Sequence, residues 1–269
     1  MNIFYDTHAH LDYPDFQSDF AEVLARARDV GITKMISIAT SFESSRKAIM
    51  LAESYAEIFA VVGWHPSEAL DAPEDLRPQL KALAAHPKVV AIGETGLDYY
   101  RLPSTRGGTA EDDVVYKCKQ AEIFRQQLEV AAACGLNCVI HQRGETLDDT
   151  LALMQPFIGK VRGVFHCFSS DLNALARIRA TGSIVSFTGI VTFKNGQNVR
   201  DAVAATPLGE FMLETDCPFL APIPYRGKRC EPAYVKEIAD AAAQAKGSSL
   251  EELSRASCEC AHRFFLKLN

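Results

Sequence analysis

Residues 4–12 read FYDTHAHLD, a short apolar run that leads directly into two histidines separated by one residue. Side chains of a β-strand alternate between its two faces, so His8 and His10 should point the same way if this run is a strand. Asp6 and Asp12 share that alternation. Two imidazoles on one face at a strand end would suit a metal ion, because neutral imidazole nitrogens bind metals readily. The alternative is an exposed turn with incidental histidines, and this short motif alone does not decide between the two.

A short apolar run of the same kind recurs along the chain. The runs are NIFYDTH, KMISIAT, FAVVGWH, VVAIGET, NCVIH, GVFHCF, SIVSFTG and EFMLETD. Segments with helical patterning separate them, and several of these segments end in glycine, a common helix stop. Continuous apolar strands that alternate with helices indicate a parallel sheet covered by helices, and eight repeats favour a closed barrel. We therefore expect residues 1–269 to form one α/β domain, a (β/α)8 TIM barrel.

Length, composition and charge agree with this expectation. The chain has 269 residues, a usual size for such a barrel. No apolar run is long enough to span a membrane, and the histidine motif follows the N-terminus too closely for a signal peptide, so a cytoplasmic location is expected. Eight scattered cysteines without a C-x-x-C pair suggest free thiols. A net charge of −6 argues against a broad nucleic-acid-coating surface, but not against an enzyme that handles a strand end at a metal-containing pocket.

Nearly every expected strand ends in a residue that can bind a metal or transfer a proton. These residues are His8, His10, His65, Glu94, His141, His166, Glu214 and Asp216. The carboxyl ends of barrel strands meet at one mouth, where active sites lie. Five of the seven histidines fall there, whereas His86 and His262 lie in helix or loop sequence. This convergence predicts a metal site at the mouth.

The motifs DTHAHLD, GWHP, IGETGLDYY, HQRGE, VFHCFS and ETDCPFLAP resemble, in the same order, the signatures of the TatD-family metal-dependent deoxyribonucleases. The resemblance runs from residue 6 to about residue 232. It implies a TIM barrel of the metal-dependent hydrolase type that cleaves phosphodiester bonds in DNA, in the manner of a 3′–5′ exonuclease, with water activated by two metals. The expected substrate is a single strand or a strand end, and no obligate protein partner is implied.

By this resemblance, His8, His10 and Asp216 hold one metal, His141 and His166 hold the second, and Glu94 bridges the two. Imidazoles and carboxylates suit two divalent ions such as Zn²⁺, Mn²⁺ or Mg²⁺.

Catalytic and substrate-binding roles are expected of residues around these ligands. Asp216 is the candidate to orient the nucleophile and accept its proton, with pure ligation as the alternative. His65 could bond a phosphate or the leaving oxygen, and Arg143 could clamp a phosphate. Arg226, with Lys228 or Arg229, is a further phosphate candidate. Glu214 is expected to orient a ligand histidine.

The sequence departs from the family pattern at three places. Cys230 replaces the usual asparagine, Gly144 replaces an acidic residue, and residues 101–113 are longer than expected. We expect residues 101–113 to form a mobile flap beside the site, because loops of this length in a compact domain are usually functional or disordered. These departures leave the ligands intact and concern substrate preference.

Two other functions stay open. The amidohydrolase-type hydrolases of small amides, esters or lactones share the H-x-H motif, two later histidines and a final aspartate. Many of them bridge their metals with a modified lysine, where this chain has Glu94. The third possibility is a non-catalytic binding protein whose metals only stabilise the barrel, although a chain of this size does not need metals for stability.

Overall fold

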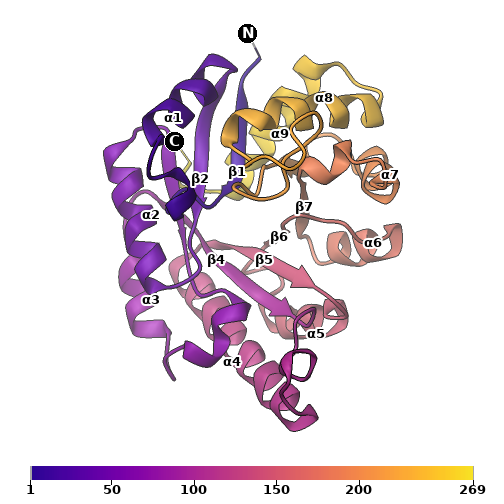
Figure 1. Cartoon of the computed structure of the whole chain (residues 1–269). Coiled ribbons are helices and arrows are strands. Elements are labelled where there is room, and N and C mark those ends of the chain that lie inside the picture. Colours follow the sequence, from indigo (N-terminus) through magenta and orange to yellow (C-terminus); the bar gives the residue numbers. More distant parts are fainter. Residues whose placement is uncertain (1, 269) are drawn as a thin grey trace.

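The computed structural model describes residues 2–268, and its strands form one eight-stranded sheet in chain order (Figure 1). The strands are β1 (Phe4–Ala9), β2 (Ile32–Ile38), β3 (Ile58–Val62), β4 (Val89–Asp98), β5 (Asn137–Arg143), β6 (Gly163–Phe165), β7 (Ile184–Phe187) and β8 (Phe211–Leu213). Each strand pairs in parallel with the next. All eight coincide with the apolar runs of the sequence, because strands covered on both faces are apolar almost throughout.

The sheet closes just beyond β8 rather than within it. The backbone N–H of Asp216 donates to the carbonyl of His8 at 2.9 Å, and the N–H of His10 donates to the carbonyl of Cys217 at 2.8 Å. Ala9 and Cys217 form the parallel bridge between the first and last strands. The predicted (β/α)8 TIM barrel is confirmed, and its closing seam lies at the histidine motif.

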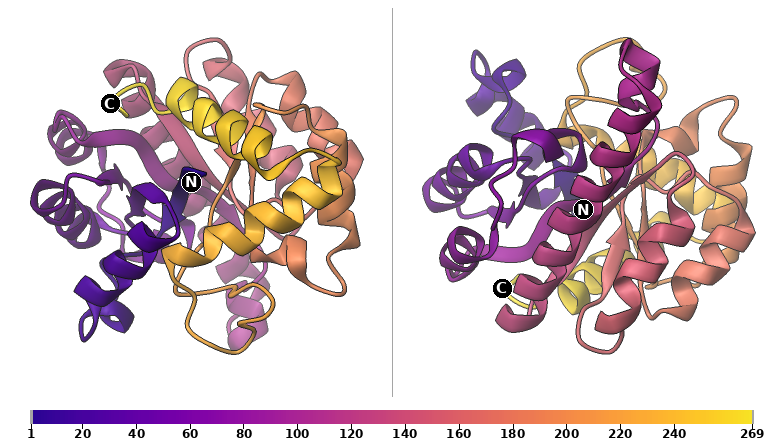
Figure 2. Two further views of the ribbon diagram at one scale, coloured as in Figure 1. Left: turned by 90° about the horizontal axis from the view of Figure 1, so that it is seen from above. Right: turned by 90° about the horizontal axis from the view of Figure 1, so that it is seen from below.

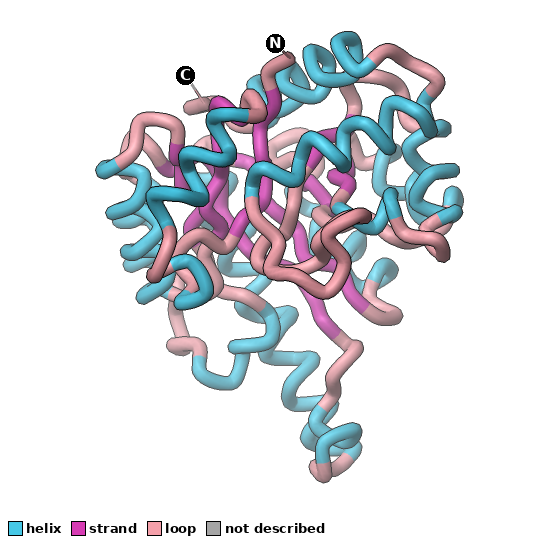
Figure 3. The backbone as a smooth tube through the Cα atoms, turned by 45° about the horizontal axis from the view of Figure 1, so that its top comes forward, coloured by secondary structure: helices cyan, strands magenta, loops and turns pink. Residues whose placement is uncertain are grey.

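Helices lie outside the sheet, as the tube view shows (Figure 3). The α-helices are α1 (Phe20–Asp29), α2 (Phe42–Ser54), α3 (Arg77–Ala84), α4 (Ala110–Cys134), α5 (Leu147–Met154), α6 (Leu172–Ala180), α7 (Gln197–Ala205), α8 (Val235–Lys246) and α9 (Leu250–Phe264). Short 3₁₀ turns are η1 (Pro14–Phe16), η2 (Pro66–Asp71), η3 (Pro103–Arg106), η4 (Gln155–Phe157), η5 (Gly189–Thr192) and η6 (Pro232–Tyr234). Across residues 2–268, no helix combines the length and apolar content needed to cross a membrane. The eight cysteines are free thiols.

Helix α9 closes the amino-terminal end of the barrel (Figure 2, left). Asn137, the first residue of β5, donates its side-chain amide to the carbonyl of Phe264 at 2.7 Å. Apolar side chains from the strands pack against the end of α9 and the residues after it. They include Ile36, Val61, Val90, Val139, Val164, Ile184 and Met212, which meet Phe264, Phe265 and Leu268. Apolar packing therefore seals the interior of the barrel at this end.

The segment after β4 differs from its prediction. Instead of a loop over residues 101–113, the chain forms the turn η3 and begins α4 at Ala110. Thr109 accepts a bond from the N–H of Asp112, and the Asp112 carboxylate accepts one from the N–H of Thr109, which is a capping box. Ser104 donates to Asp113 through both its N–H and its hydroxyl. The expected flap is therefore shorter than residues 101–113, because the T-x-x-D pattern starts the helix at Ala110, and its mobility stays a prediction.

We expect Phe264→Ala to lower the free energy of unfolding by about 3–5 kcal/mol, because the buried ring fills the closed end of the barrel. Chemical denaturation measures this loss. Phe219→Ala is the matched control, since the Phe219 side chain is 50% exposed and its removal should cost less than about 1 kcal/mol. Equal losses in the two variants would contradict the sealing role of α9.

Candidate metal centre

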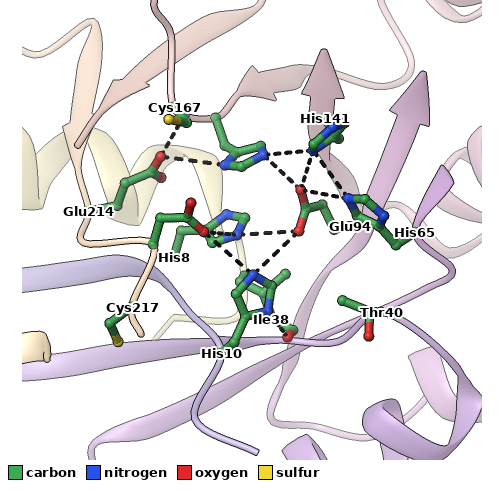
Figure 4. Close-up of polar contacts among 12 residues, drawn as sticks. His8, His10, Ile38, Thr40, His65, Glu94, His141, Cys167, Glu214 and Cys217 are labelled. Carbon is green, nitrogen blue, oxygen red and sulfur yellow. Dashed lines mark hydrogen bonds and ion pairs between the residues drawn. The ribbon is translucent and has the colours of Figure 1, made fainter. Parts of the chain in front are cut away.

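The carboxyl ends of the strands bring the predicted ligands together in one cluster (Figure 4). Its members are His8 and His10 of β1 or its end, Glu94 of β4, His141 of β5, His166 after β6, Asp216 after β8, and His65 after β3. In Figure 4, Glu94 lies between His8 and His10 on one side and His65 and His141 on the other. The cluster is buried or nearly so, which means that water competes little with its internal interactions.

The first half of the cluster has the spacing of ligands around a common ion. The Nε2 atoms of His8 and His10 each lie 3.5 Å from Oδ1 of Asp216. Nε2 of His8 lies 3.4 Å from Oε2 of Glu94, and Nε2 of His10 lies 3.7 Å from it. Two ligands at about 2.1 Å from a tetrahedral ion are about 3.4 Å apart, so these atoms fit such a centre. Both ring nitrogens of His8 are buried without a hydrogen-bond partner among the described residues, which a metal ligand would explain.

The second half of the cluster gathers around the other oxygen of Glu94. Oε1 lies 2.7 Å from Nδ1 of His141, 2.7 Å from Nε2 of His166 and 3.5 Å from Nε2 of His65. The nitrogens of His141 and His166 are 3.2 Å apart. The two carboxylate oxygens of Glu94 therefore face different groups of histidines, an arrangement suited to a bridging ligand.

Hydrogen bonds at the outer nitrogens determine which ring atoms are available. Nδ1 of His10 lies 3.0 Å from the carbonyl of Ile38 and must donate to it, which leaves Nε2 free as a ligand. Nε2 of His141 lies 3.2 Å from Oδ2 of Asp98, which leaves Nδ1 for the centre. His65 is different, because its Nδ1 accepts the N–H of Ser67 at 3.0 Å. A neutral His65 then carries its proton on Nε2, so it suits a hydrogen-bond donor better than a metal ligand.

Opposite charges compensate the burial of Glu94. Burial alone would raise the pKa of this carboxyl group, but the charge of His166 and the hydrogen bond from His141 hold the pKa well below its usual value. Burial likewise works to lower the pKa of His166, and the nearby Glu94 carboxylate outweighs it and raises that pKa. Glu94 is therefore a carboxylate at neutral pH, which is the form that binds cations.

Three further carboxyl groups support the cluster from behind. Asp98 holds His141, and Glu214 accepts the N–H of Cys167 at 2.7 Å while its Oε1 lies 3.7 Å from Nδ1 of His166. Asp6 accepts bonds from the N–H and hydroxyl of Thr215 at 2.9 and 2.6 Å, and its burial raises the pKa to about 7. Sequence reasoning anticipated Glu214 but missed Asp98. Strand alternation placed Asp98 on the same face as Glu94 and could have identified it.

Backbone conformation explains two residues of the predicted motifs. Gly96 has φ +133°, and a Cβ there would lie 2.1 Å from the carbonyl oxygen of His141. Only glycine allows β4 and β5 to approach this closely beside the ligands. Asp216 has φ +60°, an uncommon value for a non-glycine residue, and strained residues of this kind gather at functional sites.

The predicted phosphate-binding arginines have different surroundings. Arg143 is exposed at the end of β5, two residues after His141, and its guanidinium lies 4.3 Å from the ring centre of Tyr100. Arg226 bonds the carbonyl of Ala221 and stacks on Phe193, and these contacts do not bring it to the cluster.

Arg229 is paired twice with Asp19, at 2.7 Å each, and its role as a phosphate ligand stays a prediction.

The mouth also carries an aromatic corner. Tyr13 stacks on His10 at 4.8 Å between ring centres, and Phe219 meets both rings edge-on at 6.2 Å from His10 and 6.1 Å from Tyr13.

Two of the three departures from the family pattern, Cys230 and Gly144, lie outside this group of aromatic rings. Cys230 is fully buried, and Gly144 has φ +78°, which disfavours the acidic residue expected there.

Comparison with known proteins shows similarity over nearly the whole chain. The family described as TatD related DNase matches residues 5–266. The uncharacterized metal-dependent hydrolase YabD of Bacillus subtilis (strain 168) is 36% identical over 97% of this chain and 98% of its own length. The 3′–5′ ssDNA/RNA exonuclease TatD of Cronobacter turicensis is 33% identical over 98% of both chains. The matched region includes every member of the cluster.

Solved structures agree with these relatives. The crystal structure of YjjV, a TatD homologue from Escherichia coli K12, has a TM-score of 0.87 and 27% identity and covers 98% of both chains. An uncharacterized amidohydrolase from Saccharomyces cerevisiae has a TM-score of 0.81 and 16% identity. It covers 98% of this chain and all of its own, and at this identity the likeness concerns the fold alone.

Glu94→Gln should lose most bound metal while the barrel stays folded, because an amide is a poor substitute for a shared carboxylate and packing holds a chain of this size together. Elemental analysis beside circular dichroism measures both quantities. The control is Glu259→Gln, which changes an exposed carboxylate on α9. Full metal occupancy in the Glu94 variant would contradict a bridging role.

Proposed function

Because the chain belongs to the TatD family of metal-dependent hydrolases, we propose that it is a nuclease that removes nucleotides from the 3′ end of a DNA strand. The observation that carries this proposal is the division of one buried carboxylate, Glu94, between two groups of histidines at the barrel mouth. The name of the Cronobacter turicensis relative, a 3′–5′ ssDNA/RNA exonuclease, supports the same class of substrate.

Two divalent cations, Zn²⁺, Mn²⁺ or Mg²⁺, fit the residues present. His8, His10 and Asp216 would hold one cation, His141 and His166 the other, and Glu94 would contribute one oxygen to each. Glu94, Asp216, Asp98 and Glu214 supply four negative charges in and behind the cluster, which two divalent cations would balance. When bound, such cations lower the pKa of water to about 7 and stabilise charge on phosphoryl oxygens.

Asp216 and His65 have the properties that proton transfer requires. Burial works to raise the pKa of Asp216, but its bond with His10 and the charges around it lower that pKa, so the carboxylate is ready to accept a proton from water. Burial lowers the pKa of His65, which keeps the ring neutral with Nε2–H directed into the cluster. His65 would then donate a hydrogen bond to a phosphate or leaving oxygen.

Phe219 and Arg143 are the groups at the mouth that would contact the strand. Phe219 is half exposed beside His10, where a terminal base could stack on its ring. Arg143 offers a guanidinium to a neighbouring phosphate. The chain carries a net charge of −6, so its contacts with the backbone of the substrate would be few and local.

A hydrolase of a small amide, ester or lactone is the second candidate, because such enzymes share the H-x-H motif, two later histidines and a final aspartate with this chain. The bridging position argues against it. This chain has the carboxylate of Glu94 there, and its oxygens contact histidines of both groups without any lysine in the cluster.

Oligonucleotide binding measured across a salt series distinguishes the two candidates. Asp216→Asn is the suitable inactive protein, because asparagine tolerates the left-handed backbone at this position. We expect a single-stranded oligonucleotide to bind with a shallow salt dependence, equivalent to roughly two to four released counterions, since each phosphate contact contributes about 0.7 to the slope. Arg143→Gln should reduce the slope by about 0.7.

The control for Arg143 is Arg28→Gln, a change in an exposed arginine that pairs with Glu57. The salt dependence measured with Arg28→Gln should have the same slope as that of the Asp216→Asn protein without a further substitution. Turnover of a lactone or amide by the wild type, without oligonucleotide binding at low salt, would overturn the nuclease proposal.

A further inference from the structure

A second polar cavity lies at the end of the barrel opposite the metal centre. Its volume is about 550 Å³, and its lining includes Arg162, Arg179, Arg263, Glu210 and Cys260. Arg162 directly precedes β6 and Glu210 directly precedes β8, so the cavity opens at the amino-terminal end of these strands. The cluster of histidines lies at their carboxyl ends, and the two sites are separated by the apolar interior of the barrel.

The three arginines come from different elements and are each held in place along one edge. Nε of Arg162 donates to the carbonyl of Gly182 at 2.9 Å, and Nη2 of Arg263 donates to the carbonyl of Gly209 at 2.7 Å. Nε of Arg179 donates to the Glu210 carboxylate at 3.1 Å. A guanidinium has five N–H donors, so these anchors leave several donors of each group for another partner. Anchoring also reduces the conformational entropy that a ligand would otherwise have to restrict.

The balance of charge in this cavity is positive. Three guanidinium groups face one carboxylate, Glu210, in a chain whose net charge is −6. Ile184, Leu208 and the buried thiol of Cys260 supply an apolar part of the wall. Burial raises the pKa of Cys260 to about 11 against the opposing charges of Arg263 and Arg162, which is consistent with guanidinium groups close to the thiol.

We propose that this cavity binds the phosphate group of a small phosphorylated molecule of about nucleotide size. Guanidinium forks match phosphate oxygens, and a tetrahedral phosphate offers enough oxygens for three of them, whereas a carboxylate has two oxygens and serves one fork. The volume lies within the range of small-molecule sites, and the apolar wall would contact the organic part of the ligand. The site is independent of the metal centre and of the function proposed for it.

Titration calorimetry of the full-length protein tests this site with inorganic phosphate, a nucleoside 5′-monophosphate and the same nucleoside without phosphate. We expect both phosphates to bind and the nucleoside not to bind. Tighter binding of the monophosphate than of inorganic phosphate would identify an esterified phosphate as the preferred ligand.

Arginine variants identify the cavity as the place of binding. Arg162→Gln combined with Arg263→Gln should weaken phosphate binding by at least about tenfold, because each charge-assisted hydrogen bond contributes about that factor. Arg255→Gln is the matched control, since Arg255 is an exposed arginine of α9 like Arg263 but pairs with Glu259 and does not line the cavity. Any phosphate that binds at the metal centre does so equally in the wild type, the double arginine variant and the Arg255 control. Differences in phosphate affinity among these proteins therefore report on the cavity.

A change in the opposite direction provides an independent measurement. Glu210→Gln removes the one carboxylate of the cavity and releases Arg179, so it should tighten phosphate binding severalfold. Glu210→Gln also tests the phosphate site if the double arginine variant does not fold. Equal affinity in the wild type and the arginine variant, or unchanged or weaker binding in Glu210→Gln, would overturn the proposal.

Discussion

Glu94 places a buried carboxylate between histidines from several strands, and burying a charge in this way is costly unless opposite charge compensates it. No single element of the chain could supply that compensation. His8 and His10 come from the first strand, His141 from the fifth, and His166 from the end of the sixth, so they meet Glu94 only when the barrel closes. The polar cluster and the seam between the first and last strands are therefore linked: the N–H of Asp216 donates to the carbonyl of His8 at 2.9 Å, and both residues are predicted ligands.

The amino-terminal end of the barrel contributes mainly to stability, whereas the carboxyl end carries the candidate metal centre. At the amino-terminal end, Phe264 and Phe265 seal the interior with apolar contacts that require no polar compensation. This packing contributes stability that the carboxyl end, with its buried charges and left-handed Asp216, cannot supply. The same separation is general among TIM barrels, whose sites lie at the carboxyl ends of the strands. The predicted ligands can accordingly be substituted without removing the packing that holds the fold.

Sequence patterns predicted the features of the structure that depend on hydrophobic periodicity and on position within a strand. Apolar runs located every strand, and alternation placed His8 and His10 on one face. It did not predict contacts between residues far apart in the sequence. The pairing of Arg229 with Asp19 links the segment after β8 to the region before α1, and nothing local to either residue indicates it. The tautomer of His65 likewise depends on the N–H of Ser67. The start of α4 was a different kind of error, because the Thr109 capping box was present in the sequence and went unused.

The distribution of cationic side chains bears on the nuclease proposed above, because the net charge of the chain is −6. Arg26 pairs with Glu231 and Arg229 pairs with Asp19, so these two guanidinium groups link the loop after β8 to the region around α1. For the nuclease proposed above, the attraction of a phosphodiester would then arise mainly inside the cluster itself. In that arrangement, one phosphate group contributes most of the binding free energy, and further nucleotides along the strand add little. Such a distribution favours an enzyme that acts at an end over one that follows a long duplex.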